Sequence, residues 1–343
     1  MKDGKIPRHL ALLTVFIACS LAVQAQDNEI PRPCPFVFTM HKRGETQAIR
    51  YASSHPLDKL DTTISTLLIY IQGTKRDALG YFEYAEHMAK SARRKKETLV
   101  MSPQYSNAAD LDHYKLANDF LYWKKAAWKD GYTSTTEEGR PRHISMSSFE
   151  VMDSLVTFVL TSGHFPNIKR VVISGHSGGG QFVQRYSATT PIPDLLTGYQ
   201  FRFIVINPAF YMYPDNKRPI GKLTYMVPDI TACPVYNRYP RGLVDLNTYA
   251  KATGAARILD NMVHRDIVFL LGEDDTREEE LDVSCGANLQ GPERLDRGAN
   301  YITYIMSFPG YPYKKNYDIV SGSGHNPDKM INSSEAKKWV FGK

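Results

Sequence analysis

The chain has 343 residues, of which 42% are hydrophobic and 23% are charged, and its formal net charge is +6. This is an ordinary globular composition, and a chain of this length can bury a large core without a metal or many disulfides. The charge is too mild to indicate nucleic-acid binding.

Residues 1–25 have the pattern of a secretory signal peptide. Their start is basic, residues 10–23 form an almost unbroken apolar run, and Val23-Gln24-Ala25 offers a small-residue cleavage site. We therefore expect cleavage after Ala25 and a secreted or periplasmic protein with no stable membrane insertion. The alternative is a lipoprotein, because the residues before Cys19 loosely resemble a lipid-attachment box.

The rest of the chain, 26–343, alternates between predicted strands and predicted helices. Apolar runs predict strands at 35–40, 47–52, 65–72, 98–102, 170–174, 201–206, 267–271 and 317–320. Helices are expected at 80–92, 147–162, 178–185 and 333–341, the second of them opening on a capping box. This order indicates a mostly parallel sheet with helices on both faces. Residues 208–263 are too long for a plain crossover and are interpreted as a lid insertion.

A pentapeptide of the G-x-S-x-G type, Gly175-His176-Ser177-Gly178-Gly179, follows the strand predicted at 170–174. An apolar strand, a tight turn and then a helix place Ser177 at the edge of the sheet, above a helix N-terminus. Gly175 and Gly179 are expected because such a turn is strained and crowded. Ser177 is the predicted nucleophile.

The base and the acid are expected after later strands. His325 is the only histidine after Asp275, and it stands in a Gly- and Ser-rich loop beyond the last predicted strand. The acid should follow the strand at 267–271, where Asp275 fits the spacing from Gly272 and Asp274 is the alternative. The acidic residues 278–282 are interpreted as a solvated helix face.

An oxyanion needs two backbone N–H donors. One is expected from Gly178, directly after the nucleophile. The other is expected from Thr74, because Gly73 lets the turn after the strand at 65–72 approach closely.

These pieces, in this order, resemble the α/β-hydrolase superfamily over nearly the whole chain after residue 25. The motifs that carry the resemblance are GHSGG, GEDD and GSGH. The segments IQGTKRDALGYF, INPAFYMYP and CGANLQGPERLDRGANY are similar to those of exported, esterase- or lipase-like bacterial and fungal hydrolases. The resemblance implies an α/β-hydrolase fold, and it implies that Gln72 replaces a histidine common in the oxyanion turn.

The predicted activity is hydrolysis of a small or polymeric carboxylic ester by Ser177, His325 and Asp275, with no metal or organic cofactor. A serine peptidase of the aminopeptidase type and a non-catalytic binding protein on the same scaffold are the alternatives. Aromatic residues near the expected cleft either bind substrate or pack inside the protein; they are Tyr122, Trp123, Trp128, Phe210, Tyr211, Tyr213, Phe308, Tyr311 and Tyr313.

Three cysteines remain after the expected cleavage. Export permits one disulfide and leaves one thiol over. Cys233–Cys285 is the expected pair, because both lie in long connections that flank the predicted site, and Cys34 is the expected free thiol. The alternative is that all three are reduced.

Overall fold

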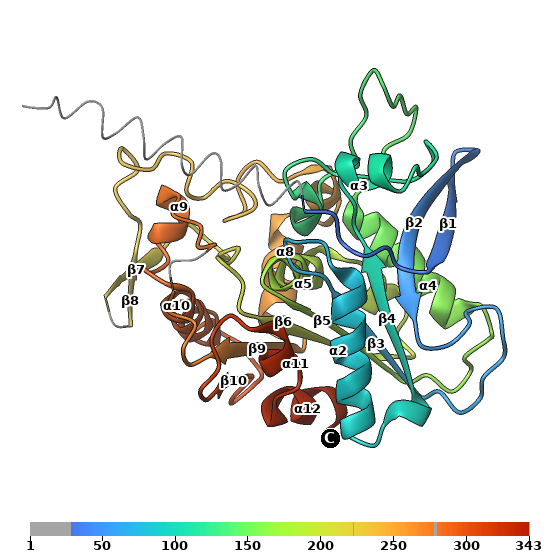
Figure 1. The fold of residues 1–343 in the computed structure, drawn as a ribbon. Helices are drawn as coiled ribbons and strands as arrows, with labels where there is room; N and C mark the ends of the chain where they lie inside the picture. The colour runs from blue at the N-terminus through green and yellow to red at the C-terminus, as the bar shows by residue number, and fades with distance from the viewer. Residues whose placement is uncertain (1–28, 222, 278–279, 343) are drawn as a thin grey trace, which may run out of the picture.

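The computed structural model describes residues 29–221, 223–277 and 280–342 (Figure 1). The signal peptide predicted at 1–25 and the lipid-attachment alternative at Cys19 lie outside the described residues. No helix within these ranges is both long enough and apolar enough to cross a bilayer.

An eight-stranded sheet forms the centre of the molecule. Its strands are β1 (Phe36–Lys42), β2 (Glu45–Ser53), β3 (Thr66–Ile71), β4 (Thr98–Gln104), β5 (Arg170–His176), β6 (Gln200–Ile206), β9 (Ile267–Gly272) and β10 (Tyr317–Val320). They lie in the order β1-β2-β4-β3-β5-β6-β9-β10. β2 is antiparallel to β1 and β4, and the strands from β4 to β10 are parallel. The predicted sheet is therefore confirmed.

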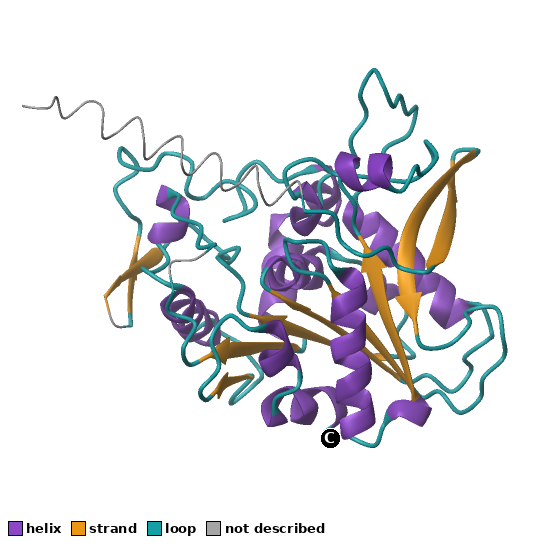
Figure 2. Cartoon of the chain, viewed as in Figure 1, coloured by secondary structure: helices purple, strands orange, loops and turns teal. Residues whose placement is uncertain are grey.

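Helices cover both faces of this sheet, as Figure 2 shows. One face carries α4 (Ser148–Thr161), α5 (Gly178–Thr189), α8 (Ala255–His264) and α10 (Arg294–Met306). The other carries α2 (Ala78–Ser91), α11 (Pro327–Ile331) and α12 (Ser334–Phe341). Each strand serves both cores, because successive side chains point to opposite faces. In β3, Leu67 packs in the first core and Leu68 in the second, and both are fully buried.

The shorter elements lie in the connections. They are α3 (Ala108–His113), α6 (Ile192–Leu195), α7 (Thr248–Thr253), α9 (Cys285–Asn288), the ribbon strands β7 (Arg218–Gly221) and β8 (Thr224–Met226), and the 3₁₀ turns η1 (Lys95–Glu97) and η2 (Ala127–Asp130).

The predicted helices are confirmed as α2, α4, α5 and α12, and the capping box of Ser147 and Glu150 is present at α4. The helix expected over 278–282 is wrong for its described part. Glu280 has φ 57°, and the Asp282 carboxylate accepts a hydrogen bond from the Ser284 amide and pairs with Arg241. A residue at positive φ cannot continue a right-handed helix.

A disulfide joins Cys233 to Cys285, as expected, and Cys34 is a buried free thiol. The bridge spans 52 residues and connects the segment 208–263 with the chain that follows Asp275. The protein therefore ties a long connection directly to the region after β9.

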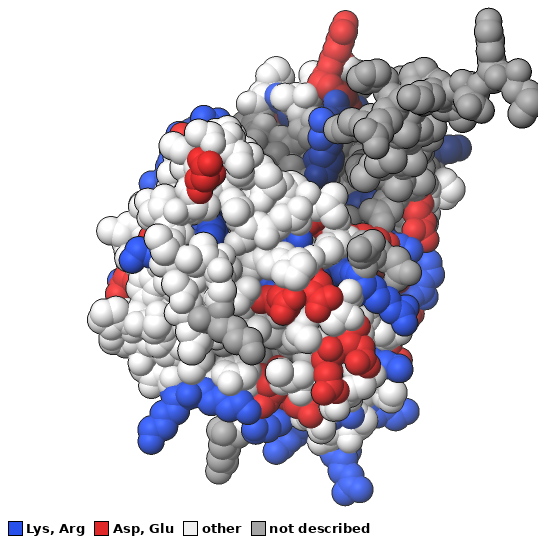
Figure 3. All heavy atoms as spheres, turned by 90° about the vertical axis from the view of Figure 1, so that its left-hand side faces the viewer, with Lys and Arg blue, Asp and Glu red and all other residues white. Residues whose placement is uncertain are grey.

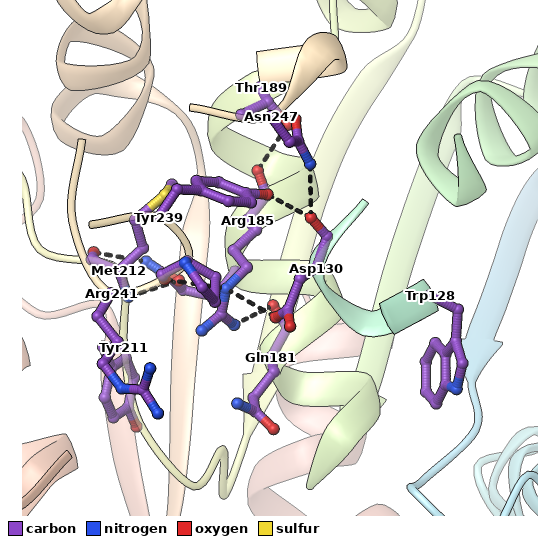
Figure 4. A network of polar contacts seen from close by, with 12 residues as sticks. Trp128, Asp130, Gln181, Arg185, Thr189, Tyr211, Met212, Tyr239, Arg241 and Asn247 are labelled. Atoms are coloured by element: carbon purple, nitrogen blue, oxygen red, sulfur yellow. Dashed lines mark hydrogen bonds and ion pairs between the residues drawn. The ribbon is translucent and has the colours of Figure 1, made fainter. Parts of the chain in front are cut away.

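Buried polar contacts fix the segment 208–263 on α5 (Figure 4). Arg185 of α5 is fully buried, and its Nε lies 3.2 Å from Asp130 Oδ1 and 3.2 Å from the Pro240 carbonyl oxygen. Tyr239 Oη and Asn247 Nδ2 both donate to the Asp130 carbonyl, at 2.5 and 2.9 Å. One buried carboxylate residue thus anchors both the helix and the segment.

The ribbon β7–β8 belongs to the same segment and lies at the surface. Figure 3 shows this side of the molecule, where a broad area carries neither acidic nor basic side chains. The exposed apolar side chains of the segment are Ile220, Leu223, Met226, Val227, Ile230, Val235 and Val244. Whether residues 208–263 act as a lid stays a prediction.

Candidate functional site

The turn between β5 and α5 holds Ser177 in a strained backbone conformation, φ 58° and ψ −119°. A Cβ on Gly175 would lie 2.4 Å from the carbonyl of Gly179, and one on Gly179 would lie 2.3 Å from the Ile71 oxygen. Both positions therefore exclude a side chain, as the sequence predicts. Strain of this kind is stored where a nucleophile must project from the edge of a sheet.

The imidazole of His325 lies between Ser177 and Asp275. His325 Nε2 is 2.9 Å from Ser177 Oγ, and His325 Nδ1 is 2.8 Å from Asp275 Oδ2. With a neutral imidazole, Ser177 Oγ–H donates to Nε2, and Nδ1–H donates to the carboxylate. The three residues come from the ends of β5, β9 and β10, and parallel strands present these ends at one edge.

The Asp275 side chain is 1% exposed, and a second charged group approaches it. Arg294, the first residue of α10, places Nη1 3.5 Å from Asp275 Oδ1 and donates to the Arg277 carbonyl at 3.2 Å. Asp274 is exposed instead, and its amide donates to the Ser323 carbonyl. The structure thus brings Asp275, and not Asp274, to the histidine.

The two expected oxyanion donors lie together. Gly178 is the first residue of α5, so its N–H has no partner within the helix. A Cβ on Gly178 would lie 3.1 Å from the Thr74 nitrogen, which places the turn after β3 directly against the nucleophile turn. Both amides therefore belong to one small region beside Ser177.

Gln72 fixes the start of that turn. Its buried amide group donates to the Tyr105 carbonyl at 2.8 Å and accepts from the Tyr105 amide at 3.2 Å. These bonds continue the pairing of β3 and β4 past the strand ends. The residue that departs from the common histidine thus holds the turn through the neighbouring strand.

A second histidine stands behind the first. His176 is fully buried, and its Nδ1 lies 3.2 Å from Tyr81 Oη. Burial, reinforced by the nearby His325 and Arg294, holds the pKa of His176 well below its ordinary value. The His176 ring is therefore neutral near pH 7.

A cavity of about 680 Å³ opens beside Ser177 and His325. Charged residues supply much of its wall: Lys75, Asp77, Asp274, Arg277, Glu280, Arg294 and Lys329. Tyr81 and Tyr84 contribute rings, and among the described residues that line it Pro327 alone has an aliphatic side chain. The cavity therefore offers polar contacts to a ligand.

The aromatic residues considered as substrate contacts lie elsewhere. Tyr122, Trp123 and Trp128 are fully buried, as are Tyr211 and Tyr213, and Phe210 is 3% exposed. Phe308 packs edge-on against Tyr304 of α10, and Tyr311 against Tyr313. None of the nine is among the described residues that line the cavity, so the packing interpretation is confirmed for the buried six.

Sequence reasoning gave no role to Tyr81, His176, Asn207 or Arg294. Asn207 is buried at the end of β6; its Oδ1 accepts from the Gly272 amide at 2.8 Å and its Nδ2 donates to the Gly324 carbonyl at 3.4 Å. It thereby joins the acid turn to the histidine loop. Asn207 and Arg294 both lie in segments singled out by resemblance, which is the signal that could have found them.

Within the described part of the chain, no three His, Cys, Asp or Glu side chains are grouped to hold a metal ion. A scan with protein-family models finds no match, and a search of curated proteins finds none either.

Two solved structures resemble the chain over most of its length. LpqC, a poly(3-hydroxybutyrate) depolymerase from Bordetella parapertussis, matches with a TM-score of 0.60 at 18% identity over 91% of each chain. Poly(aspartic acid) hydrolase-1 from Sphingomonas sp. KT-1 matches with a TM-score of 0.60 at 24% identity over 90% of this chain and 99% of its own. With its strand order, its helices on both faces and these structural neighbours, the chain has the α/β-hydrolase fold.

Proposed function

We propose that this protein is a secreted serine hydrolase that cleaves carboxylic esters through an acyl-enzyme intermediate. The observation that carries the proposal is the continuous contact from Ser177 Oγ to His325 and on to Asp275, at 2.9 and 2.8 Å. A serine hydroxyl needs such a base to become a nucleophile, and the base needs an acid to orient it.

In the proposed reaction His325 Nε2 takes the Ser177 proton as Oγ attacks the ester carbonyl. The amides of Gly178 and Thr74 hold the oxyanion of the tetrahedral intermediate. The intermediate collapses and the alcohol leaves with the proton from His325. Water then attacks the acyl-enzyme by the same route and regenerates Ser177. Asp275 fixes the tautomer of His325 and stabilises its charged form.

The cavity favours short or polar substrates. Burial of one methylene group is worth about 0.8 kcal/mol, which is roughly fourfold in kcat/KM. Because Pro327 is the one aliphatic side chain in the described lining, lengthening the acyl chain gains less than this. The names of the two structural neighbours, a depolymerase and a hydrolase of polymers, support hydrolysis as the reaction class.

Export and the lid belong to the same proposal. Residues 1–25 would direct the chain out of the cytoplasm, and the Cys233–Cys285 disulfide is typical of proteins in such oxidising compartments. The segment 208–263 would then be a lid whose described residues pack on α5 and do not line the cavity.

The test is hydrolysis of p-nitrophenyl acetate, butyrate and octanoate by residues 26–343, with Ser177→Ala as the matched variant. Loss of a triad member removes about 10³- to 10⁶-fold of the rate. Equal activity of the two proteins would contradict the proposal. Activity on aminoacyl p-nitroanilides alone would favour a peptidase, and failure of a fluorophosphonate to label Ser177 would favour a binding protein.

A further inference from the structure

The side chain of Thr74 lies as close to the nucleophile turn as its backbone does. A Cβ built on Gly178 would be 2.8 Å from Thr74 Oγ1 and 3.1 Å from Thr74 N. The hydroxyl and the amide of one residue therefore contact the same face of Gly178, whose own N–H is the other expected donor. Thr74 is half-buried and lines the cavity together with Ser177.

The Thr74 hydroxyl is not used by the fold. Among the residues that the structure describes, none forms a hydrogen bond with Thr74 Oγ1, whereas the Ser102 hydroxyl, for example, donates to the Tyr70 carbonyl. A hydroxyl that faces a cavity without a protein partner is available to a ligand.

The turn that presents this hydroxyl is held from two sides. Tyr81 Oη occupies the position where a side chain on Gly73 would stand, 2.5 Å from that Cβ, and Tyr81 is itself bonded to His176. On the other side Gln72 is bonded to Tyr105. Thr74 is β-branched, so its χ1 is stiff and little freedom is lost when Oγ1 makes a bond. Donors fixed in advance are those that stabilise developing charge best.

We propose that Thr74 is a catalytic residue that supplies two of three oxyanion donors, its backbone N–H and its Oγ1–H, with the N–H of Gly178 as the third. This inference rests on the proposed function, because it needs the oxyanion that Ser177 attack creates. No proton is transferred in this step: Oγ1 keeps its hydrogen and donates it to the carbonyl oxygen as that oxygen gains negative charge. The class of ligand is thus the tetrahedral oxyanion of an acyl-transfer reaction.

The first experiment compares Thr74→Val with Thr74→Ser in residues 26–343. Valine keeps the shape of threonine and lacks the hydroxyl, whereas serine restores a hydroxyl on Cβ. Removal of one oxyanion donor lowers kcat by roughly 10²-fold, so we expect this loss in Thr74→Val, with KM within about twofold. The kcat of Thr74→Ser should be at least tenfold higher than that of Thr74→Val. Thr161→Val, on the exposed side of α4, makes the same chemical change away from the cavity and should leave kcat unchanged.

The second measurement separates an oxyanion donor from a structural role. A thionoester places sulfur, a weak acceptor, where the ester has its carbonyl oxygen. The loss caused by Thr74→Val should therefore be several-fold smaller with the thionoester than with the matching ester. Equal losses with both substrates, or a kcat of Thr74→Val within twofold of the wild type, would overturn the inference.

The two proposals fail in different ways. Wild-type activity that survives Ser177→Ala contradicts the proposed function, and with it the role of Thr74. Activity that requires Ser177 but is insensitive to Thr74→Val contradicts only the role of the Thr74 hydroxyl.

Discussion

The imidazole of His176 lies against the imidazole of His325, with the ring centroids 4.6 Å apart and the ring planes tilted by 43°. Because burial keeps the pKa of His176 well below its ordinary value, this neighbour stays neutral while His325 takes up a proton. A charged ring in its place would oppose the imidazolium on which the proposed mechanism depends.

The same burial predicts a pH dependence of stability. The pKa of His176 is lowered in the folded state, so below about 6.5, the ordinary pKa of histidine, the unfolded chain takes up a proton that the folded chain refuses. This linkage lowers the unfolding free energy between pH 7 and pH 5, by at most about 2 kcal/mol, the limit for a histidine that takes up no proton in the folded state over this range. The unfolding free energy of His176→Gln, measured in urea, should therefore fall less than that of the wild type over this interval, by up to about 2 kcal/mol. His87→Gln, at an exposed histidine of α2, is the control and should follow the wild type.

The choice between Asp274 and Asp275 is open to a direct comparison. Asp275→Asn keeps the shape of the side chain but favours the wrong tautomer of His325, which should lower kcat about 10⁴-fold. Asp274→Asn alters an exposed residue of the cavity wall and should change kcat by less than about tenfold. The kcat values of both variants come from steady-state hydrolysis of p-nitrophenyl acetate. A larger loss of kcat in Asp274→Asn than in Asp275→Asn would assign the acid to Asp274.

Arg294 should support the fold around the acid. Its side chain is 2% exposed and lies 3.5 Å from the buried carboxylate of Asp275. Removal of one partner of a buried ion pair destabilises by about 3–5 kcal/mol, so Arg294→Gln should lower the unfolding free energy by this amount. Arg257→Gln, which breaks pairs that are about half exposed, should cost less than 1 kcal/mol. Similar losses in the two variants, measured by urea unfolding, would argue against this role.

The disulfide should contribute substantially to stability. A cross-link that closes a loop of this length lowers the conformational entropy of the unfolded chain and so raises its free energy by about 4 kcal/mol. The double variant Cys233→Ala and Cys285→Ala should lose about this much unfolding free energy in urea. Added reductant should destabilise the wild type and leave the double variant unchanged. Equal sensitivity of both proteins to reductant would mean that the bridge is absent.

Cys34 should be unreactive until the protein unfolds. Burial raises the pKa of this thiol to about 12, and only the thiolate is nucleophilic. At pH 8 iodoacetamide should leave folded residues 26–343 unmodified and should add one carbamidomethyl group after unfolding in urea without reductant. The intact mass reports both results, and modification of the folded protein would contradict the burial of Cys34.

The strands and the nucleophile turn could be predicted because each is encoded locally. Val171, Val172 and Ile173 form a fully apolar run, and glycines bracket Ser177 where backbone contacts exclude a side chain. The acid remained ambiguous because Asp274 and Asp275 are adjacent, and only the packing of the histidine loop distinguishes them.

Helix α10 could not be predicted from its sequence pattern. Its first turns carry Arg294, Arg297 and Gly298, all buried, where an amphipathic pattern would have apolar residues. Arg297 is satisfied by carbonyls of Gly291 and Ala209, and a Cβ on Gly298 would lie 2.5 Å from Leu271. Ala209 and Leu271 are distant in the chain, so tertiary contacts decide this helix. The cavity wall is equally non-local, since it combines residues of five separate loops and helix starts.

The cavity is lined partly by residues on rigid turns and partly by residues at the surface, and this has an evolutionary consequence. Ser177 and Thr74 stand on turns that the central sheet and α5 hold rigidly, whereas Arg277, Glu280 and Asn326 reach the cavity from surface loops and Lys329 reaches it from the exposed side of the short helix α11. Substitutions at these four exposed positions leave both cores intact, so they can change which ligands bind without destabilising the fold. A library that randomises these four positions should therefore yield mostly folded proteins with an unaltered reaction and varied substrate ranges.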